Sequence, residues 1–112
     1  MFRNKYKNKK TVIDGITFDS KKEADRYCEL KLLEKAGHIK NLQLQPKFVI
    51  LPKYEINGRK VRAIHYIADF KYEWKNTGEV VIEDVKGVKT EVYKIKKKLF
   101  EYNTGLEIQE IW

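Results

Sequence analysis

The sequence predicts a mixed α/β domain whose central sheet is flanked by helices, with elements in the order αβββαβ. The chain has 112 residues, which is the size of one domain, and 42% of them are hydrophobic, which suffices for a core. Helix-start signals stand at Ser20 and Thr90, and between them β-type alternation fills three segments. We expect one domain over residues 11–112, preceded by a basic arm over residues 1–10.

The first helix is expected over residues 20–36. Ser20 is a good N-cap, Glu23 three residues later completes a capping box, and Gly37 ends the helix. Before it, Asp14-Gly15 predicts a tight hairpin. The second helix is expected over residues 90–102, capped by Thr90. Its apolar stripe is predicted to consist of Val92, Ile95, Leu99 and Tyr102.

Four strands complete the predicted order. The first, over residues 42–56, contains two prolines that favour an edge or a bend, and Asn57-Gly58 predicts a hairpin after it. The second, over residues 61–74, places Tyr66, Ala68, Phe70, Tyr72 and Trp74 on one face. A four-residue loop leads to the third strand, over residues 79–86, and residues 106–112 form the last.

The loop between the second and third strands sets their register. If Trp74 pairs with Glu79, Asp69 stands directly opposite Asp84, with Cβ atoms only ~4.5–5.5 Å apart. Two opposed carboxylates repel, and a divalent cation between them removes the repulsion. Lys86 lies two residues beyond Asp84 and shares its face, whereas Glu83 points to the opposite face and is excluded.

Two carboxylates and a lysine on one face would suffice for metal-dependent hydrolysis of a phosphodiester. Mg²⁺ takes one or two carboxylates and keeps several waters, and an ammonium can stabilise the developing charge. The alternative is a surface ion-pair cluster of Asp69, Asp84 and Lys86. Apolar residues on both faces of the third strand favour the site, because a strand buried on both faces would make unpaired charges costly.

The charge of the chain favours a polyanionic partner. Lys and Arg number 24 against 16 Asp and Glu, a formal charge of +8. A merely basic surface is the alternative. The residues expected to contact DNA phosphates lie in the N-terminal arm and around the second helix: Arg3, Lys5, Lys7, Lys9, Lys10, Lys89, Lys94, Lys96, Lys97 and Lys98. A single cysteine fits a reducing cytosol, and we expect neither a signal peptide nor a membrane anchor.

The motif around these carboxylates resembles that of a known superfamily. The run Tyr66-Ile67-Ala68-Asp69-Phe70, followed by Ile82-Glu83-Asp84-Val85-Lys86-Gly87, resembles the PD-(D/E)xK nucleases, with Ala68 where the superfamily's name puts a proline. The whole chain looks like small phage and prophage endonuclease-like proteins related to Holliday junction resolvases. The resemblance implies a restriction-endonuclease-like core, metal binding by Asp69 and Asp84, catalysis by Lys86 and a contribution from Glu23.

The predicted function is therefore a DNA endonuclease that depends on Mg²⁺, with Mn²⁺ as a substitute, and acts on branched DNA in phage DNA processing. The expected location is the cytoplasm, which is the host cytoplasm if a phage encodes the protein. Cutting a junction twice implies a twofold homodimer. A nicking or end-directed nuclease and a catalytically silent DNA-binding module remain alternatives. Glu23 has two interpretations, as a metal ligand and as a helix cap alone.

Overall fold

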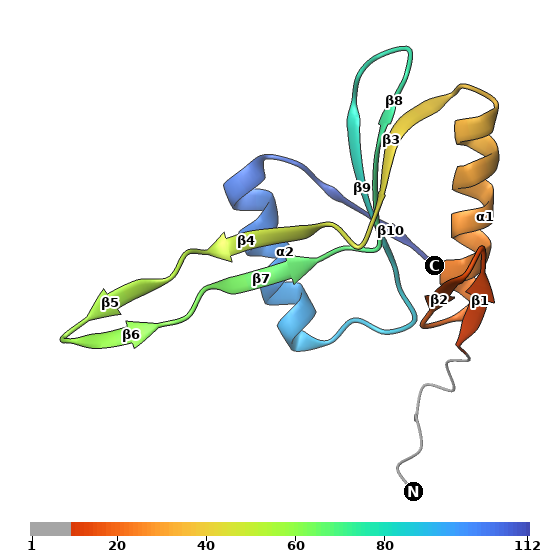
Figure 1. The fold of residues 1–112 in the computed structure, drawn as a ribbon. Helices are drawn as coiled ribbons and strands as arrows, with labels where there is room; N and C mark the ends of the chain where they lie inside the picture. The colour runs from red at the N-terminus through yellow and green to blue at the C-terminus, as the bar shows by residue number, and fades with distance from the viewer. Residues whose placement is uncertain (1–9) are drawn as a thin grey trace, which may run out of the picture.

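A four-stranded mixed sheet with a helix packed on each side forms the body of the protein in the computed structural model, which describes residues 10–112 (Figure 1). The strand order is β10-β9-β8-β3; β10 runs parallel to β9, and the other pairs are antiparallel. Taking the helices and the strands of this sheet along the chain gives αβββαβ, so the predicted fold class is confirmed. The elements of this body are α1 (Lys21–Lys35), β3 (Ile39–Leu44), β8 (Phe70–Trp74), β9 (Val80–Val85), α2 (Glu91–Thr104) and β10 (Ile108–Ile111).

The first helix begins and ends where the sequence predicts. The Ser20 hydroxyl accepts a hydrogen bond from the Glu23 N–H at 3.1 Å, and Gly37 follows the helix with a φ of +83°. Helix α1 covers one face of the sheet, because its apolar side chains share a core with residues of β3, β8 and β9. That core consists of Phe18, Ala24, Tyr27, Leu30, Ile39, Phe70, Tyr72 and Val81.

The second helix is also capped as predicted, but it buries a different face. The Thr90 hydroxyl accepts from the Tyr93 N–H at 3.1 Å, and Tyr93 and Phe100 are the buried residues of the helix. The predicted apolar stripe was wrong: Val92, Ile95, Leu99 and Tyr102 are 62%, 60%, 37% and 88% exposed. Tyr93 and Phe100 are one helical heptad apart, so their rings lie on the same face of α2, and this is the face that packs on the core. The core on this side consists of Ile50, Tyr66, Ala68, Ile82, Tyr93, Phe100 and Ile108.

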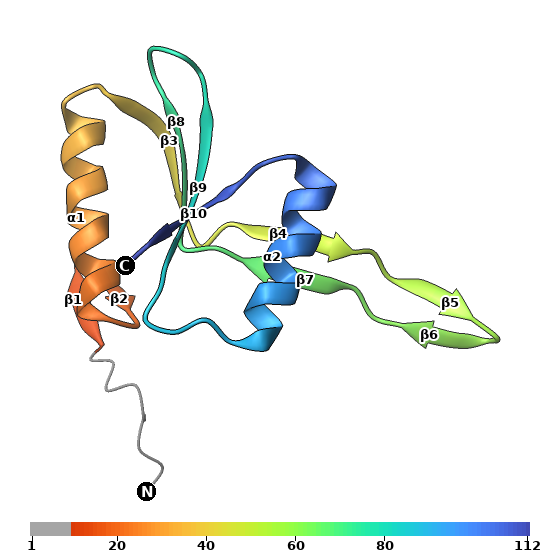
Figure 2. The ribbon, with the colours of Figure 1, turned by 180° about the vertical axis from the view of Figure 1, so that it is seen from behind.

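Two long strands of the prediction are each broken into three. Residues 42–56 divide among β3, β4 (Lys47–Leu51) and β5 (Tyr54–Ile56), and residues 61–74 divide among β6 (Arg59–Val61), β7 (Ile64–Ile67) and β8. Strand β4 pairs with β7 and β5 with β6, so a long ribbon leaves the body and passes α2, as both views show (Figures 1 and 2). Gln45, whose φ is +49°, and Pro46 separate β3 from β4.

This break overturns the predicted face of the second strand. Tyr66 and Ala68 belong to the core under α2, whereas Phe70 and Tyr72 belong to the core under α1. Strict alternation holds only within an unbroken strand, and the chain changes pairing partner at Ala68 and Asp69.

Both predicted hairpins are confirmed. β1 (Thr11–Ile13) pairs with β2 (Ile16–Phe18) through Asp14-Gly15, and β5 pairs with β6 through Asn57-Gly58. All four turn residues have positive φ, as two-residue hairpin turns of this kind require. Neither helix is long and apolar enough to cross a membrane, for the part of the chain that the structure describes.

Candidate active site

The register of β8 and β9 brings Asp69 next to Asp84. Phe70 stands opposite Glu83, and the Trp74 N–H donates to the Glu79 carbonyl at 2.9 Å, so the register expected from the loop is confirmed. The Asp69 N–H donates to the Glu83 carbonyl at 3.0 Å, which extends the ladder one residue beyond the end of β8. Asp69 therefore lies at the edge of the four-stranded sheet where β8 begins and the ribbon of β4 and β7 leaves it.

Backbone groups of neighbouring segments hold Asp69 in place. Its carbonyl accepts from the Gln45 N–H at 2.9 Å, and its side-chain Oδ2 accepts from the Val85 N–H at 2.7 Å. The carboxylate is thus oriented by β9, the strand that also carries Asp84. One carboxylate oxygen is engaged by this bond, which leaves lone pairs for other ligands.

Asp84 is buried, with 5% of its surface exposed, and two side chains contact its carboxylate. Lys86 Nζ lies 2.9 Å from Oδ1, and the Tyr66 hydroxyl donates to Oδ2. Burial raises the pKa of Tyr66 well above its ordinary value, so this hydroxyl keeps its proton and remains a donor. Lys86 also lies over the Tyr93 ring, 3.5 Å from its centre. The lysine is therefore held between an anion and an aromatic face.

Glu23 reaches the same place from the first turn of α1. It is 6% exposed, and it lines a pocket of about 250 Å³ together with Asp69, Asp84 and Lys86. The helix cap is made by the Ser20 hydroxyl and the Glu23 N–H, and this bond does not involve the Glu23 carboxylate. The structure thus brings together all four of the site residues predicted from the sequence. The pocket is completed by Asp19, Ser20, Lys22, Val85 and Gly87.

The pKa values of Asp69 and Glu23 are both raised in this pocket. Burial raises the pKa of Asp69 to about 8, and the negative charges of Asp84 and then Glu23 add to the rise. The pKa of Glu23 is raised by burial and by the charge of Asp19, while a hydrogen bond with Asp69 opposes the rise. The protein therefore holds repelling acids together at a cost, and a cation in the pocket would relieve that cost.

The oxygen donors of the pocket fit Mg²⁺, although the side chains of the described residues do not form a complete coordination shell. Among residues 10–112, no three His, Cys, Asp or Glu side chains are already arranged to hold a metal ion. Mg²⁺ is usually bound by one or two carboxylates and several waters, so Asp69 and Asp84 meet its needs with Glu23 nearby. Both have carboxylate oxygens in one pocket, and hard oxygen donors are the ligands that this ion prefers.

A second, larger pocket of about 700 Å³ adjoins the first and shares Asp84 and Lys86 with it. Basic side chains from three elements line this pocket: Lys47 of β4, His65 of β7 and Lys96 of α2. Lys22 and Lys47 were not predicted to belong to the site. No local pattern marks them, because only the path of the ribbon and of α1 brings them there.

Residues 3–112 match a protein family described as "Protein of unknown function (DUF1064)". The chain belongs to the DUF1064 family. We found no curated protein and no solved structure that matches it. The match covers the whole of the candidate site in this DUF1064 member, from Glu23 to Lys86.

The lysines that were predicted to contact DNA have different surroundings in this DUF1064 member. Lys96 lines the larger pocket, and Lys10 and Lys98 are exposed. Lys89 and Lys97 pair with Glu110, at 2.9 and 3.4 Å, and Lys94 pairs with Glu91 at 3.1 Å. The remaining predicted contacts lie outside the described residues: Arg3, Lys5, Lys7 and Lys9.

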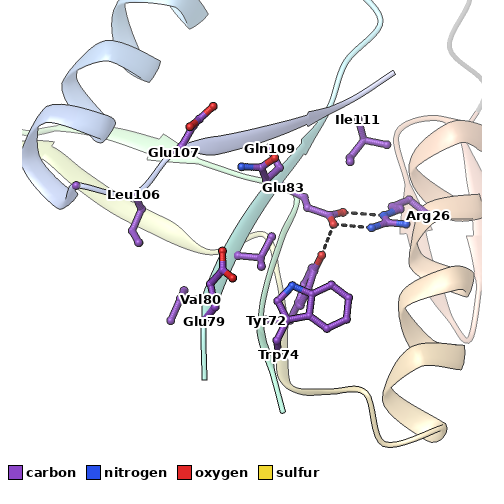
Figure 3. Close-up of a pocket in the computed structure, with 12 residues that line it drawn as sticks. Arg26, Tyr72, Trp74, Glu79, Val80, Glu83, Leu106, Glu107, Gln109 and Ile111 are labelled. Carbon is purple, nitrogen blue, oxygen red and sulfur yellow. Dashed lines mark hydrogen bonds and ion pairs between the residues drawn. The ribbon is translucent and has the colours of Figure 1, made fainter. Parts of the chain in front are cut away.

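Glu83, which the prediction excluded from the site, does not line the pocket of the four site residues, and its side chain points from β9 toward Arg26 of α1 (Figure 3). Its carboxylate accepts two hydrogen bonds from Arg26, at 2.8 and 2.6 Å, and one from the Tyr72 hydroxyl at 2.5 Å. The bond with Glu83 raises the pKa of Arg26 above its ordinary value, so the guanidinium stays charged. Glu83 is 1% exposed and fully paired, which makes it a structural carboxylate that ties α1 to the sheet.

Proposed function

We propose that this protein is a Mg²⁺-dependent DNA endonuclease in which Asp69 and Asp84 hold the metal, Glu23 contributes a further carboxylate and Lys86 acts on the reacting phosphate. The observation that carries the proposal is the convergence of three carboxylates and one lysine in a single pocket. They come from α1, from the junction of β7 and β8, and from the end of β9. A fold gains no stability from repelling acids, so their convergence favours a bound cation.

Each residue has a distinct task in hydrolysis. A bound Mg²⁺ would supply an activated water and charge neutralisation at the phosphate. Asp69, fixed by the Val85 N–H, and Asp84, fixed by the Tyr66 hydroxyl, present oxygens in set directions. Lys86 is not a metal ligand, because an ammonium has no lone pair. Its ammonium can instead orient water or stabilise the anionic phosphorus centre.

DNA is the proposed substrate because cations surround these acids. Lys22 rims the smaller pocket, and Lys47 and Lys96 rim the larger one. Such lysines hold phosphates without reading bases, which favours recognition of DNA shape. The sequence motif resembles that of the PD-(D/E)xK nucleases, and its two parts lie on adjacent strands within an αβββαβ order. Branched DNA is the preferred substrate under this proposal, and a twofold homodimer would make paired cuts across a junction.

The test is cleavage of labelled duplex, single-stranded and four-way junction DNA, with Mg²⁺ and with chelator. We expect cleavage only with Mg²⁺ or Mn²⁺, little or none with Ca²⁺, and the fastest cleavage on the junction. Full activity in excess chelator refutes the metal role. Binding without cleavage under every metal condition supports the silent DNA-binding module in its place.

Two variants assign the site, and a third controls for loss of charge. Asp84→Asn should abolish cleavage because it loses metal binding, while DNA binding persists. Lys86→Ala should stop cleavage while Mg²⁺ binding, measured by calorimetry, is retained. Glu107→Gln removes an exposed carboxylate on the far side of β9 and should cut at the wild-type rate. Wild-type cleavage by Asp84→Asn would refute the site.

A further inference from the structure

The outer part of the ribbon, residues 53–62, forms a projecting hairpin. We call this hairpin the arm from here on, as distinct from the N-terminal residues 1–10. Tyr54 stands opposite Val61, Glu55 opposite Lys60 and Ile56 opposite Arg59 across the Asn57-Gly58 turn. Every residue from 52 to 60 is exposed, and the arm extends past α2 with no other element beside it in either view (Figures 1 and 2). The arm therefore adds nothing to the core.

The charged side chains of the arm are mostly cationic. Lys53, Arg59, Lys60 and Arg62 oppose the single carboxylate of Glu55. Within residues 10–112, none of these four cations takes part in an ion pair. Strand alternation places Lys60 and Glu55 on one face, and Lys53 and Arg62 continue that face at its base. The arm thus presents unpaired positive charge to a polyanion.

The arm is continuous with the candidate site. Its strands run directly into β4 and β7, and Lys47 and the residues of β7 line the pocket that contains Asp84 and Lys86. A linear polyanion that lies in this pocket and follows the ribbon outward meets the arm next. Two-stranded ribbons fit the major groove of duplex DNA, and isolated ribbons of this length are marginal in water without a partner.

We propose that the arm binds duplex DNA on one side of the scissile bond, with Lys53, Lys60 and Arg62 at phosphates. This inference rests on the proposed function for the position of the scissile bond. The contacts are to the backbone, so the arm sets the orientation of the duplex and not its sequence. A second copy of the chain is the competing occupant, through the apolar face formed by Tyr54, Ile56 and Val61.

The first test measures binding of a fluorescent duplex of three helical turns, by anisotropy in chelator over a range of salt concentrations. The arm variant is Lys53→Ala, Lys60→Ala and Arg62→Ala, and its matched control is Lys35→Ala, Lys40→Ala and Lys75→Ala, which removes three exposed cations elsewhere. We expect the arm variant to bind about tenfold more weakly or worse and its log–log salt slope to flatten by roughly 2–3 units. The control should keep the wild-type slope. Equal slopes for the two variants overturn the proposal.

The second test is direct crosslinking in a Cys28→Ala background. A photoreactive label at Lys60→Cys should crosslink to the duplex, while the same label at Asn76→Cys, in the loop between β8 and β9, should not. Sedimentation tests the competing occupant with a double variant of the apolar face, Tyr54→Ser with Ile56→Ser. If this double variant changes from dimer to monomer while the arm variant keeps the wild-type salt slope, the arm binds a second copy and the proposal fails.

The two proposals fail separately. If the wild type cuts DNA while the arm variant binds the duplex like the wild type and the label at Lys60→Cys does not crosslink, only the arm assignment is lost. If no metal supports cleavage but the arm variant loses duplex binding and salt dependence, the arm stands as a DNA-binding element and the nuclease proposal is lost.

Discussion

The backbone N–H of Gln45 donates to the carbonyl oxygen of Asp69 at 2.9 Å, at the point where both chain segments change pairing partner. One residue further along, the Ala68 N–H donates to the Pro46 carbonyl at 3.1 Å. These bonds join the body sheet to the ribbon at Asp69, which the Glu83 carbonyl and the Val85 N–H hold beside β9. The position of a candidate metal ligand thus depends on the unusual backbone of Gln45, whose φ is +49°.

Two substitutions at Gln45 test this dependence. Gln45→Gly should keep stability within about 1 kcal/mol of wild type, because glycine adopts positive φ readily. Gln45→Pro should lower stability by about 3 kcal/mol or more, because proline cannot adopt this φ and lacks the N–H that Asp69 accepts. Urea denaturation measures both. A proline variant as stable as the glycine variant would contradict the role given to this bond.

The metal-free protein should lose stability as the pH rises from about 4 to about 8. Asp69 has a pKa of about 8 in the folded protein and about 3.9 when unfolded, so over this range the folded state binds the extra proton. Stability falls with pH wherever the folded state binds more protons, and the raised pKa of Glu23 acts in the same direction.

Melting temperatures in chelator across this pH range measure the effect. Asp69→Asn should flatten the decline and melt several degrees above wild type at pH 8, since about 1 kcal/mol corresponds to roughly 4–8 °C in a domain of this size class. Added Mg²⁺ should stabilise the wild type more at pH 8 than at pH 5, because it competes with that proton. A variant that melts lower than wild type at pH 8 would show that Asp69 is not under repulsion.

Glu23→Gln separates the cap from the site. The substitution keeps the backbone N–H of residue 23, which donates to the Ser20 hydroxyl, and removes only the side-chain charge. Stability should therefore be maintained or rise in chelator, while the cleavage rate falls roughly 10–100-fold. Asp25→Asn, at an exposed position of the same helix, is the control and should leave the rate unchanged. Normal cleavage by Glu23→Gln together with a lower melting temperature for Glu23→Ala would assign Glu23 to capping alone.

Arg26→Ala should destabilise the protein by about 3–5 kcal/mol, because it leaves the buried Glu83 carboxylate without its cation. The double variant Arg26→Met with Glu83→Gln should recover most of that loss, since the amide oxygen can still accept from Tyr72. Urea denaturation of Arg26→Met, Glu83→Gln and the double variant gives the coupling. Glu83→Gln should also retain metal-dependent cleavage, in contrast to Asp84→Asn, and loss of cleavage would return Glu83 to the candidate site.

Local features of this protein were predictable from the sequence because they depend on nearby residues. Asp14-Gly15 and Asn57-Gly58 determine hairpin turns through their positive φ, and Ser20 and Thr90 determine where the helices begin. The register that places Asp69 by Asp84 was also predictable, because a short loop leaves few ways to pair two strands.

Other features were decided only by the tertiary structure, because they depend on which surfaces meet. Helix α2 carries two apolar faces, and the space beneath it selected the one with Tyr93 and Phe100. The break at Ala68 arises from the path of the partner strand at Gln45, which no alternation within residues 61–74 reveals. The approach of Glu23 to Asp69 likewise requires α1 to lie against the sheet, since contacts between residues far apart in sequence follow from packing.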